Sequence, residues 1–173
     1  MQLVSVWTSE QRVYPAHAPV AAKRNKVSAI AQDLGDGAGS MVSLDAMSCQ
    51  RSVAATLVER WADYVLALKQ IQGKLHAQVA AHFSSLLAQP PSHQHLEKGH
   101  GRGERRRVWC NQDPSLVDAG AGWAGLRTLV YVQTTRWLHG RAEQAIRYFL
   151  SSLAQTSTAD LADCVRRHWG IEN

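Results

Sequence analysis

The chain has 173 residues, of which 45% are hydrophobic and 19% are charged, a balance typical of one folded domain with its own core. The sequence has no run of about 18 apolar residues and does not begin with a signal peptide, so we expect a protein that is neither membrane-spanning nor secreted. Its formal net charge of +5 fits a polyanionic partner such as nucleic acid, although charge alone does not identify one.

Two runs near the start, residues 3–8 and 11–14, are rich in valine and aromatic residues and predict the two strands of a hairpin. Because the chain would then open inside a sheet, we expect that residues preceding Met1 are missing. Residues 25–31 favour a short helix, and the glycines of residues 35–39 favour a loop.

The segment around Asp45 predicts a parallel βαβ unit. Residues 41–44 are strand-like and end at Asp45, apolar residues recur at helical spacing over residues 53–61, and a continuous apolar run covers residues 64–68. Strand, helix and strand in this order are typical of a parallel pair joined by a crossover helix.

The second half of the chain is expected to be richer in strands. Residues 71–87 show an apolar helical face, which Pro90-Pro91 must end. The polar residues 92–107 are interpreted as a loop that carries a basic run. Short strands are expected further along, and the whole segment of about residues 92–153 is interpreted as a β-rich insertion. The expected strands are 108–110, 128–133 and 145–150.

The last helix has the spacing of a capping box at its start, in residues 157–160, and an apolar stripe. Glu172 falls on that stripe. A buried carboxylate needs a cation or a metal as partner, and the other acid to consider is Asp45, at the end of its strand. An aspartate in that position and a glutamate on a helix packed over the same sheet can converge on a divalent cation.

Three cysteines, Cys49, Cys110 and Cys164, are widely spaced and form no Cys-x-x-Cys pair. This argues against a disulfide framework and against a structural zinc site. We interpret them as core thiols in a reducing cytoplasm.

Several stretches together carry a family resemblance, and they occur in order along nearly the whole chain. They resemble the catalytic domain of bacterial insertion-sequence transposases of the Asp-Asp-Glu type, and more narrowly the Aeromonas-type group of the insertion-sequence-four superfamily. The stretches are Leu-Val-Ser-Val-Trp at 3–7, Val-Ser-Leu-Asp-Ala-Met-Ser-Cys-Gln at 42–50, Ala-Asp-Tyr-Val-Leu-Ala-Leu-Lys at 62–69, His-Gly-Arg-Gly-Glu-Arg at 100–105, Tyr-Phe-Leu-Ser-Ser-Leu at 148–153 and Val-Arg-Arg-His-Trp-Gly-Ile-Glu-Asn at 165–173.

The resemblance implies an α/β fold over residues 1–173: an RNase H-like mixed sheet flanked by helices, with the β-rich insertion before the last helix. It implies DNA as substrate, Mg²⁺ or Mn²⁺ as cofactor, a bacterial protein of the cytoplasm and nucleoid, and a homodimer in the intact family member. Asp45 matches the second catalytic acid and Glu172 the third. The first acid, in an Asp-Gly-Lys motif, would precede Met1, so this chain is expected to be a clipped fragment with impaired activity.

Candidate DNA contacts are the lysine after the second parallel strand, the residues of the basic run and a histidine on the last helix. In the wider superfamily a Tyr and an Arg stand seven and four positions before the catalytic Glu, whereas here Val165 and His168 occupy those places. His168 could orient the Glu172 carboxylate or touch a phosphate. The candidates are Lys69, His100, Arg102, Arg105, Arg106 and His168.

Each candidate also has a plainer interpretation. Asp45 could be a helix cap, Glu172 a frayed terminal acid, Lys69 a solvated residue and the basic run a soluble loop. A metal site formed by the histidines at 93, 95 and 100 is disfavoured by their spacing, and Trp137 or Trp169 could stack on a base or only pack.

Two other functions remain open. One is a non-catalytic DNA-binding remnant of a transposase. The other is a host nuclease of RNase H-like fold, which would need a further acid, with Asp63 and Glu104 as nominal candidates.

Overall fold

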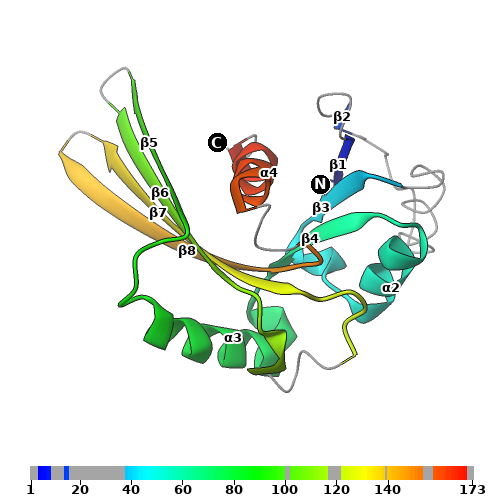
Figure 1. The fold of residues 1–173 in the computed structure, drawn as a ribbon. Helices are drawn as coiled ribbons and strands as arrows, with labels where there is room; N and C mark the ends of the chain where they lie inside the picture. Colours follow the sequence, from blue (N-terminus) through cyan, green and yellow to red (C-terminus); the bar gives the residue numbers. More distant parts are fainter. Residues whose placement is uncertain are drawn as a thin grey trace.

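The computed structural model describes residues 4–8, 14–15, 38–99, 102–116, 122–138, 140–153 and 158–170. Its strands form one sheet in the order β2-β1-β3-β4-β8-β7-β6-β5 (Figure 1). The strands are β1 Val4–Thr8, β2 Tyr14–Pro15, β3 Ser40–Leu44, β4 Asp63–Leu68, β5 His93–Gly99, β6 Arg102–Asn111, β7 Thr128–Leu138 and β8 Arg141–Ser151.

Within the described ranges three helices accompany the sheet, and short 3₁₀ turns join some of the elements. The helices are α2 Arg51–Glu59, α3 Gly73–Leu86 and α4 Thr158–Gly170, and the turns are η1 Ala46–Ser48, η2 Gln70–Gln72 and η3 Pro114–Leu116. The predicted mixed sheet flanked by helices is confirmed, and the architecture is compatible with an RNase H-like fold. No helix in these described ranges is long and apolar enough to cross a membrane.

The predicted βαβ unit is present, because β3 and β4 pair in parallel and α2 lies between them in the chain. Val42, Leu44, Tyr64 and Leu66 are completely buried in this unit, as expected for parallel strands covered on both faces. The predicted first hairpin is also confirmed, since β1 and β2 pair antiparallel.

The β-rich segment before the last helix continues the central sheet. Strands β5 to β8 form an antiparallel meander, and β8 pairs antiparallel with β4, with Leu66 opposite Leu150. The expectation of a loop over residues 92–107 is wrong, because β5 and β6 pair antiparallel from His93 opposite Val108 to Gly99 opposite Arg102. The distal part of this hairpin is polar on both faces, so it lacks the apolar alternation that marks a half-buried strand.

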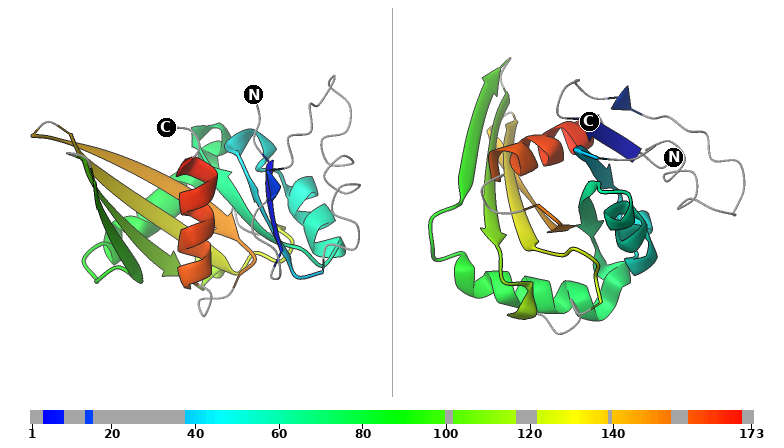
Figure 2. Two further views of the ribbon diagram at one scale, coloured as in Figure 1. Left: turned by 90° about the horizontal axis from the view of Figure 1, so that it is seen from above. Right: turned by 45° about the vertical axis from the view of Figure 1, so that its right-hand side comes forward.

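The helices divide between the two faces of the sheet (Figures 1 and 2). On one face α2 and α3 bury a core that includes an aromatic group in which Phe83 of α3 contacts Tyr131 and Tyr148 at centroid distances of 5.6 and 6.3 Å. On the other face α4 buries the apolar stripe expected from the sequence. The buried stripe residues are Leu161, Cys164 and Val165.

One predicted helix has different bounds in the structure, and two other predicted segments fall wholly or largely outside the described residues. The helix predicted over residues 71–87 begins at Gly73 and ends at Leu86, before the prolines. Ile71 belongs to η2, where it is 69% exposed. The helix expected over residues 25–31 lies outside the described residues, as do most of the glycines expected to form a loop.

Candidate functional site

Asp45 lies directly after β3, at the sheet edge where the carboxyl ends of β3 and β4 meet. Its Oδ1 accepts a hydrogen bond of 2.6 Å from the backbone N–H of Ala46, so Asp45 caps η1. Capping, one of the plainer interpretations, is therefore present. The side chain is 27% exposed, which leaves the carboxylate accessible to solvent and to a ligand.

Lys69 follows β4 at the same edge, because parallel strands end side by side. Its Nζ lies 3.3 Å from Asp45 Oδ1, and its side chain is 61% exposed. The structure thus brings the predicted catalytic acid Asp45 and the candidate DNA contact Lys69 together. An exposed ion pair of this kind contributes at most about 1 kcal/mol to folding, so the contact matters more for charge placement than for stability.

Gln72 holds the two turns of this edge together, and it is absent from our sequence-based site. Its Nε2 donates to the carbonyl of Ala46 at 2.8 Å and to that of Cys49 at 3.4 Å, while its Oε1 accepts from the backbone N–H of Lys69 at 2.9 Å. Its spacing of three residues from Lys69, as in a capping box, is the signal that could have indicated it.

Helix α4 runs toward this edge. Near its start, Thr158 bonds to the Cys110 side chain, whereas Arg166, two turns later, lies 3.9 Å from Glu97 on β5. Strand β5 runs in the same direction as β4 and β3. Four successive antiparallel pairs, β5 with β6, β6 with β7, β7 with β8 and β8 with β4, separate it from β4, and an even number of reversals restores the direction. The red, C-terminal end of α4 therefore lies on the same side as the cyan end of β3 (Figure 2, left).

Not every predicted site residue can be located. Glu172 and His100 lie outside the described residues, and for Arg102 and His168 only the strand or helix is described. His168 belongs to the last turns of α4. Its approach to the carboxyl edge follows from the helix direction.

The described residues of this edge do not by themselves make a metal site. They provide one carboxylate, Asp45, whose Oδ1 faces an N–H and an ammonium group. No group of three or more His, Cys, Asp or Glu side chains that could hold a metal occurs within the described part of the chain. A divalent cation fits here only if further acids, such as Glu172, join Asp45.

The two nominal alternative acids do not fit this edge. Asp63 begins β4, at the opposite end from Lys69, and accepts a 2.6 Å bond from Ser152 Oγ. Glu104 lies in the meander and pairs with Arg106 and with Arg136, whose Nε is 2.8 Å away. Neither carboxylate is placed to join Asp45.

The basic run is divided by strand alternation rather than forming one continuous patch. Arg106 points to the α4 side, where only 12% of its side chain is exposed and Glu104 pairs with it. Burial lowers the pKa of Arg106, and the adjacent Glu104 opposes that effect. Arg105 points to the other side of the sheet, where its guanidinium lies 5.3 Å from the Trp137 ring.

The three cysteines fit their interpretation as core thiols. All three are free. Burial raises the pKa of Cys49 and Cys164 from 9.0 to about 12, and that of Cys110 to about 11. Because the thiolate is the reactive form, none of them is suited to nucleophilic chemistry near neutral pH.

Comparisons with known proteins point to transposases. No family model and no solved structure matches the sequence. The "Uncharacterized protein in dhlA 3'region" of Xanthobacter autotrophicus is 36% identical over 156 residues, which is 88% of this chain and 53% of the relative.

Two relatives from Escherichia coli carry informative names. The "H repeat-associated putative transposase YhhI" of strain K12 is 31% identical over 87% of this chain and 42% of its own length. The "Putative transposase YncI" of strain O157:H7 is 30% identical over 100% of this chain and 46% of its own length. The chain thus spans about half the length of the curated relatives it matches, and the similarity supports a relationship to transposases.

Proposed function

We propose that this chain is a segment of the catalytic domain of a DNA transposase of the Asp-Asp-Glu type, in the insertion-sequence-four superfamily. The observation that carries the proposal is the position of Asp45. It lies at the carboxyl ends of two parallel strands, beside Lys69, at the edge toward which α4 runs. Ligand sites in open α/β sheets commonly lie at this edge, and the transposase-named relatives match across this region of the chain.

We propose that Asp45 and Glu172 are catalytic acids and together hold Mg²⁺ or Mn²⁺. Glu172 follows Gly170, the last residue of α4, by two positions. Hard cations prefer carboxylate oxygens, and a bound divalent cation would stabilise charge on the oxygens of a phosphodiester during its displacement. The sequence contains no Asp-Gly-Lys motif, so a further acid would have to come from another segment.

Lys69 has two roles in this proposal. Its ammonium group balances the Asp45 carboxylate when no cation is bound, and its exposure leaves it free to turn toward a DNA phosphate when a cation takes its place. A flexible lysine is suited to this exchange, because it acts as a mobile point charge. His168, on the last turns of α4, is proposed to contact the same substrate.

A DNA-binding and cleavage assay tests the function. We expect the 173-residue chain to bind duplex DNA in a salt-dependent way and to cleave it weakly or not at all with Mg²⁺ or Mn²⁺. Robust cleavage abolished by Asp45→Asn would contradict the proposed impairment while supporting the active site. DNA binding with neither cleavage nor binding of Mn²⁺ would favour a DNA-binding remnant, because only the catalytic segment requires the cation. Absence of DNA binding at low salt would overturn the proposal.

A further inference from the structure

Side-chain alternation sorts the charges of strands β5 to β8 onto two faces. The acidic residues of these strands are three glutamates, and all three lie on the face that α4 covers. Glu97, Glu104 and Glu143 form one cross-strand row, in which Arg136 stands between the last two. On this face Arg106 and Arg136 pair with Glu104, and the other arginines of the face, among them Arg141 and Arg147, share it with the three glutamates.

The opposite face of the same strands carries no acidic side chain in the described structure. We call it the acid-free face. It consists of three cross-strand rows lying beyond α3 toward the hairpin ends. Apart from glycine, alanine, threonine and glutamine, the rows contain Leu96, Lys98, Arg105, Arg107, Trp137 and Ile146.

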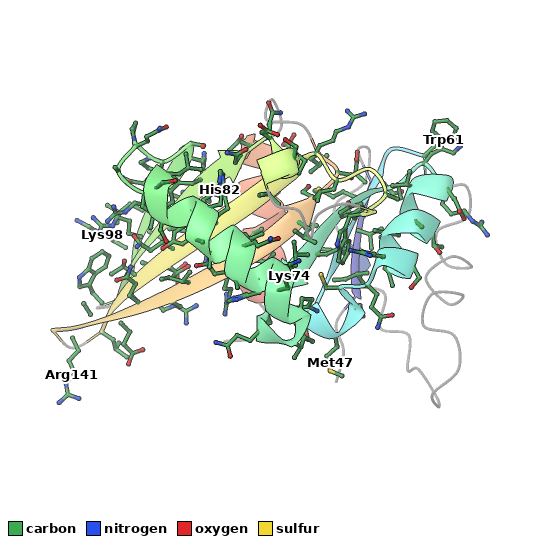
Figure 3. All side chains as sticks on the ribbon, turned by 90° about the horizontal axis from the view of Figure 1, so that it is seen from below. Met47, Trp61, Lys74, His82, Lys98 and Arg141 are labelled. Atoms are coloured by element: carbon green, nitrogen blue, oxygen red, sulfur yellow. The ribbon has the colours of Figure 1, made fainter. Side chains whose placement is uncertain are left out.

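Helix α3 extends this surface without adding acidic charge, since residues 73–86 contain one lysine, two histidines and no Asp or Glu. Figure 3 shows this side of the molecule, where α3 crosses the sheet. Lys98 and Lys74 are both visible from this side and lie well apart on it. Lys74 follows η2 closely in the chain. The surface without acidic side chains therefore extends from the acid-free face along α3 toward the edge of the sheet that carries Asp45 and Lys69.

Two arginines on the acid-free face have donors without acceptors. The Nε atoms of Arg105 and Arg107 are buried and make no hydrogen bond. A buried donor without an acceptor is unfavourable. Both residues are only half-buried. A guanidinium group presents a planar fork of donors that matches the oxygens of a phosphate, so an anionic oxygen would bind the accessible part of these groups rather than the covered Nε atoms.

Trp137 shapes the same region. Its ring lies between Arg105, whose guanidinium carbon is 5.3 Å from the ring centroid, and Gly103, where a Cβ would come within 3.4 Å of the ring. Leu96 and Ile146 on this face are 52% and 50% exposed. Cations with accessible apolar groups and no acids are typical of surfaces that bind nucleic acid.

We propose that the acid-free face binds the phosphate backbone of DNA, with Arg105 and Arg107 as phosphate contacts, Lys98 as an outer contact and Trp137 supporting Arg105. This rests on the proposed function and adds to it a specific face. It assigns Arg106 a structural role, because Arg106 points to the opposite face and is held by Glu104.

The test compares two double variants that remove the same charge from opposite faces. Binding of a short DNA duplex to the full chain is measured by fluorescence anisotropy at several salt concentrations. The first variant is Arg105→Gln with Arg107→Gln. The control is Arg136→Gln with Arg166→Gln, whose side chains are 40% and 43% exposed on the α4 side. Circular dichroism establishes that each variant is folded.

We expect the first variant to lose at least about tenfold in affinity, with the slope of log K against log salt reduced by about 2, because each phosphate contact contributes about 0.9. The control should lose much less and keep its slope. Lys98→Gln, an exposed change on the same face, should lower the slope by about 1 and serves if the double variant fails to fold.

Equal losses of DNA affinity in the two double variants would overturn the assignment to one face. Unchanged affinity in the first double variant would also overturn it. If that variant does not fold, unchanged affinity in Lys98→Gln has the same meaning. In those cases the unaltered chain still binds DNA, and the proposed function stands. Absence of binding by the unaltered chain would overturn both proposals.

Discussion

At the scale of single residues, position in a strand decides what each charged side chain can do. Arg105 and Arg106 are adjacent in the sequence, but one lies against Trp137 and the other against Glu104. The sequence predicted a basic stretch here. It did not predict which arginines would be paired, because a segment interpreted as a loop carries no expectation that successive side chains point to opposite faces of a sheet.

The Asp45 and Lys69 pair should contribute little to stability. Lys69→Gln removes a contact whose cation is 61% exposed, and exposed pairs typically contribute about 0.2–1 kcal/mol. We expect the free energy of unfolding, measured by urea denaturation, to change by less than about 1 kcal/mol, while DNA affinity falls. A large loss of stability would mean that the pair is structural rather than functional.

Gly125 allows a close contact between the loop before β7 and helix α2. Its φ is +65°, and a Cβ there would lie 2.7 Å from Val58 Cγ2. Gly125→Ala should therefore cost roughly 1–3 kcal/mol from strain and overpacking. Gly140→Ala is the matched control, because its φ is +76° and nothing lies within 4 Å. The free energy of unfolding of both variants is measured by urea denaturation. Equal losses would show that the contact with Val58 does not matter.

At the scale of elements, the carboxyl edge depends on η1 and η2 remaining together. Gln72→Ala removes the three hydrogen bonds that join these turns to each other and to Lys69. We expect a loss of roughly 1–3 kcal/mol, because a net hydrogen bond contributes about 1 kcal/mol. Gln70→Ala, an exposed change in the same turn, should be close to neutral, and similar effects in the two variants would exclude a special role for Gln72.

The elements around Asp45 were predictable because their signals are local. The apolar runs of β3 and β4, the helical spacing of α2 and the stripe of α4 each follow one period. The hairpin of β5 and β6 was not predictable in the same way, since its distal residues are mostly polar and apolar residues do not alternate along it. Its pairing depends on β7, which is distant in the chain. Gln72 was missed because a glutamine bridging two turns leaves no pattern beyond its spacing.

At the scale of the whole molecule, the buried thiols predict how stability depends on pH. Burial raises the pKa of Cys49 and Cys164 from 9.0 to about 12. The folded state thus keeps these protons at pH values where the unfolded chain releases them. Their contribution to stability is fully present below about pH 9 and is lost as the pH rises toward 12.

Urea unfolding at a series of pH values between neutral and strongly alkaline tests this dependence. Cys164→Ala should lower the stability at neutral pH and also weaken its decline in alkali, because one of the titrating groups is gone. Stability that stays constant as the pH rises well above 9.0 would contradict the burial of these thiols.

The proposed active site requires Asp45 and Glu172 to meet at one cation. A titration of the full chain with Mn²⁺, followed by electron paramagnetic resonance, measures this directly and does not require cleavage. We expect binding that weakens at least about tenfold in Asp45→Asn and in Glu172→Gln, since each removes a carboxylate ligand, and that is unchanged in the control Asp63→Asn. Binding that is absent from the unaltered chain, or unaffected by both substitutions, would contradict the proposed site.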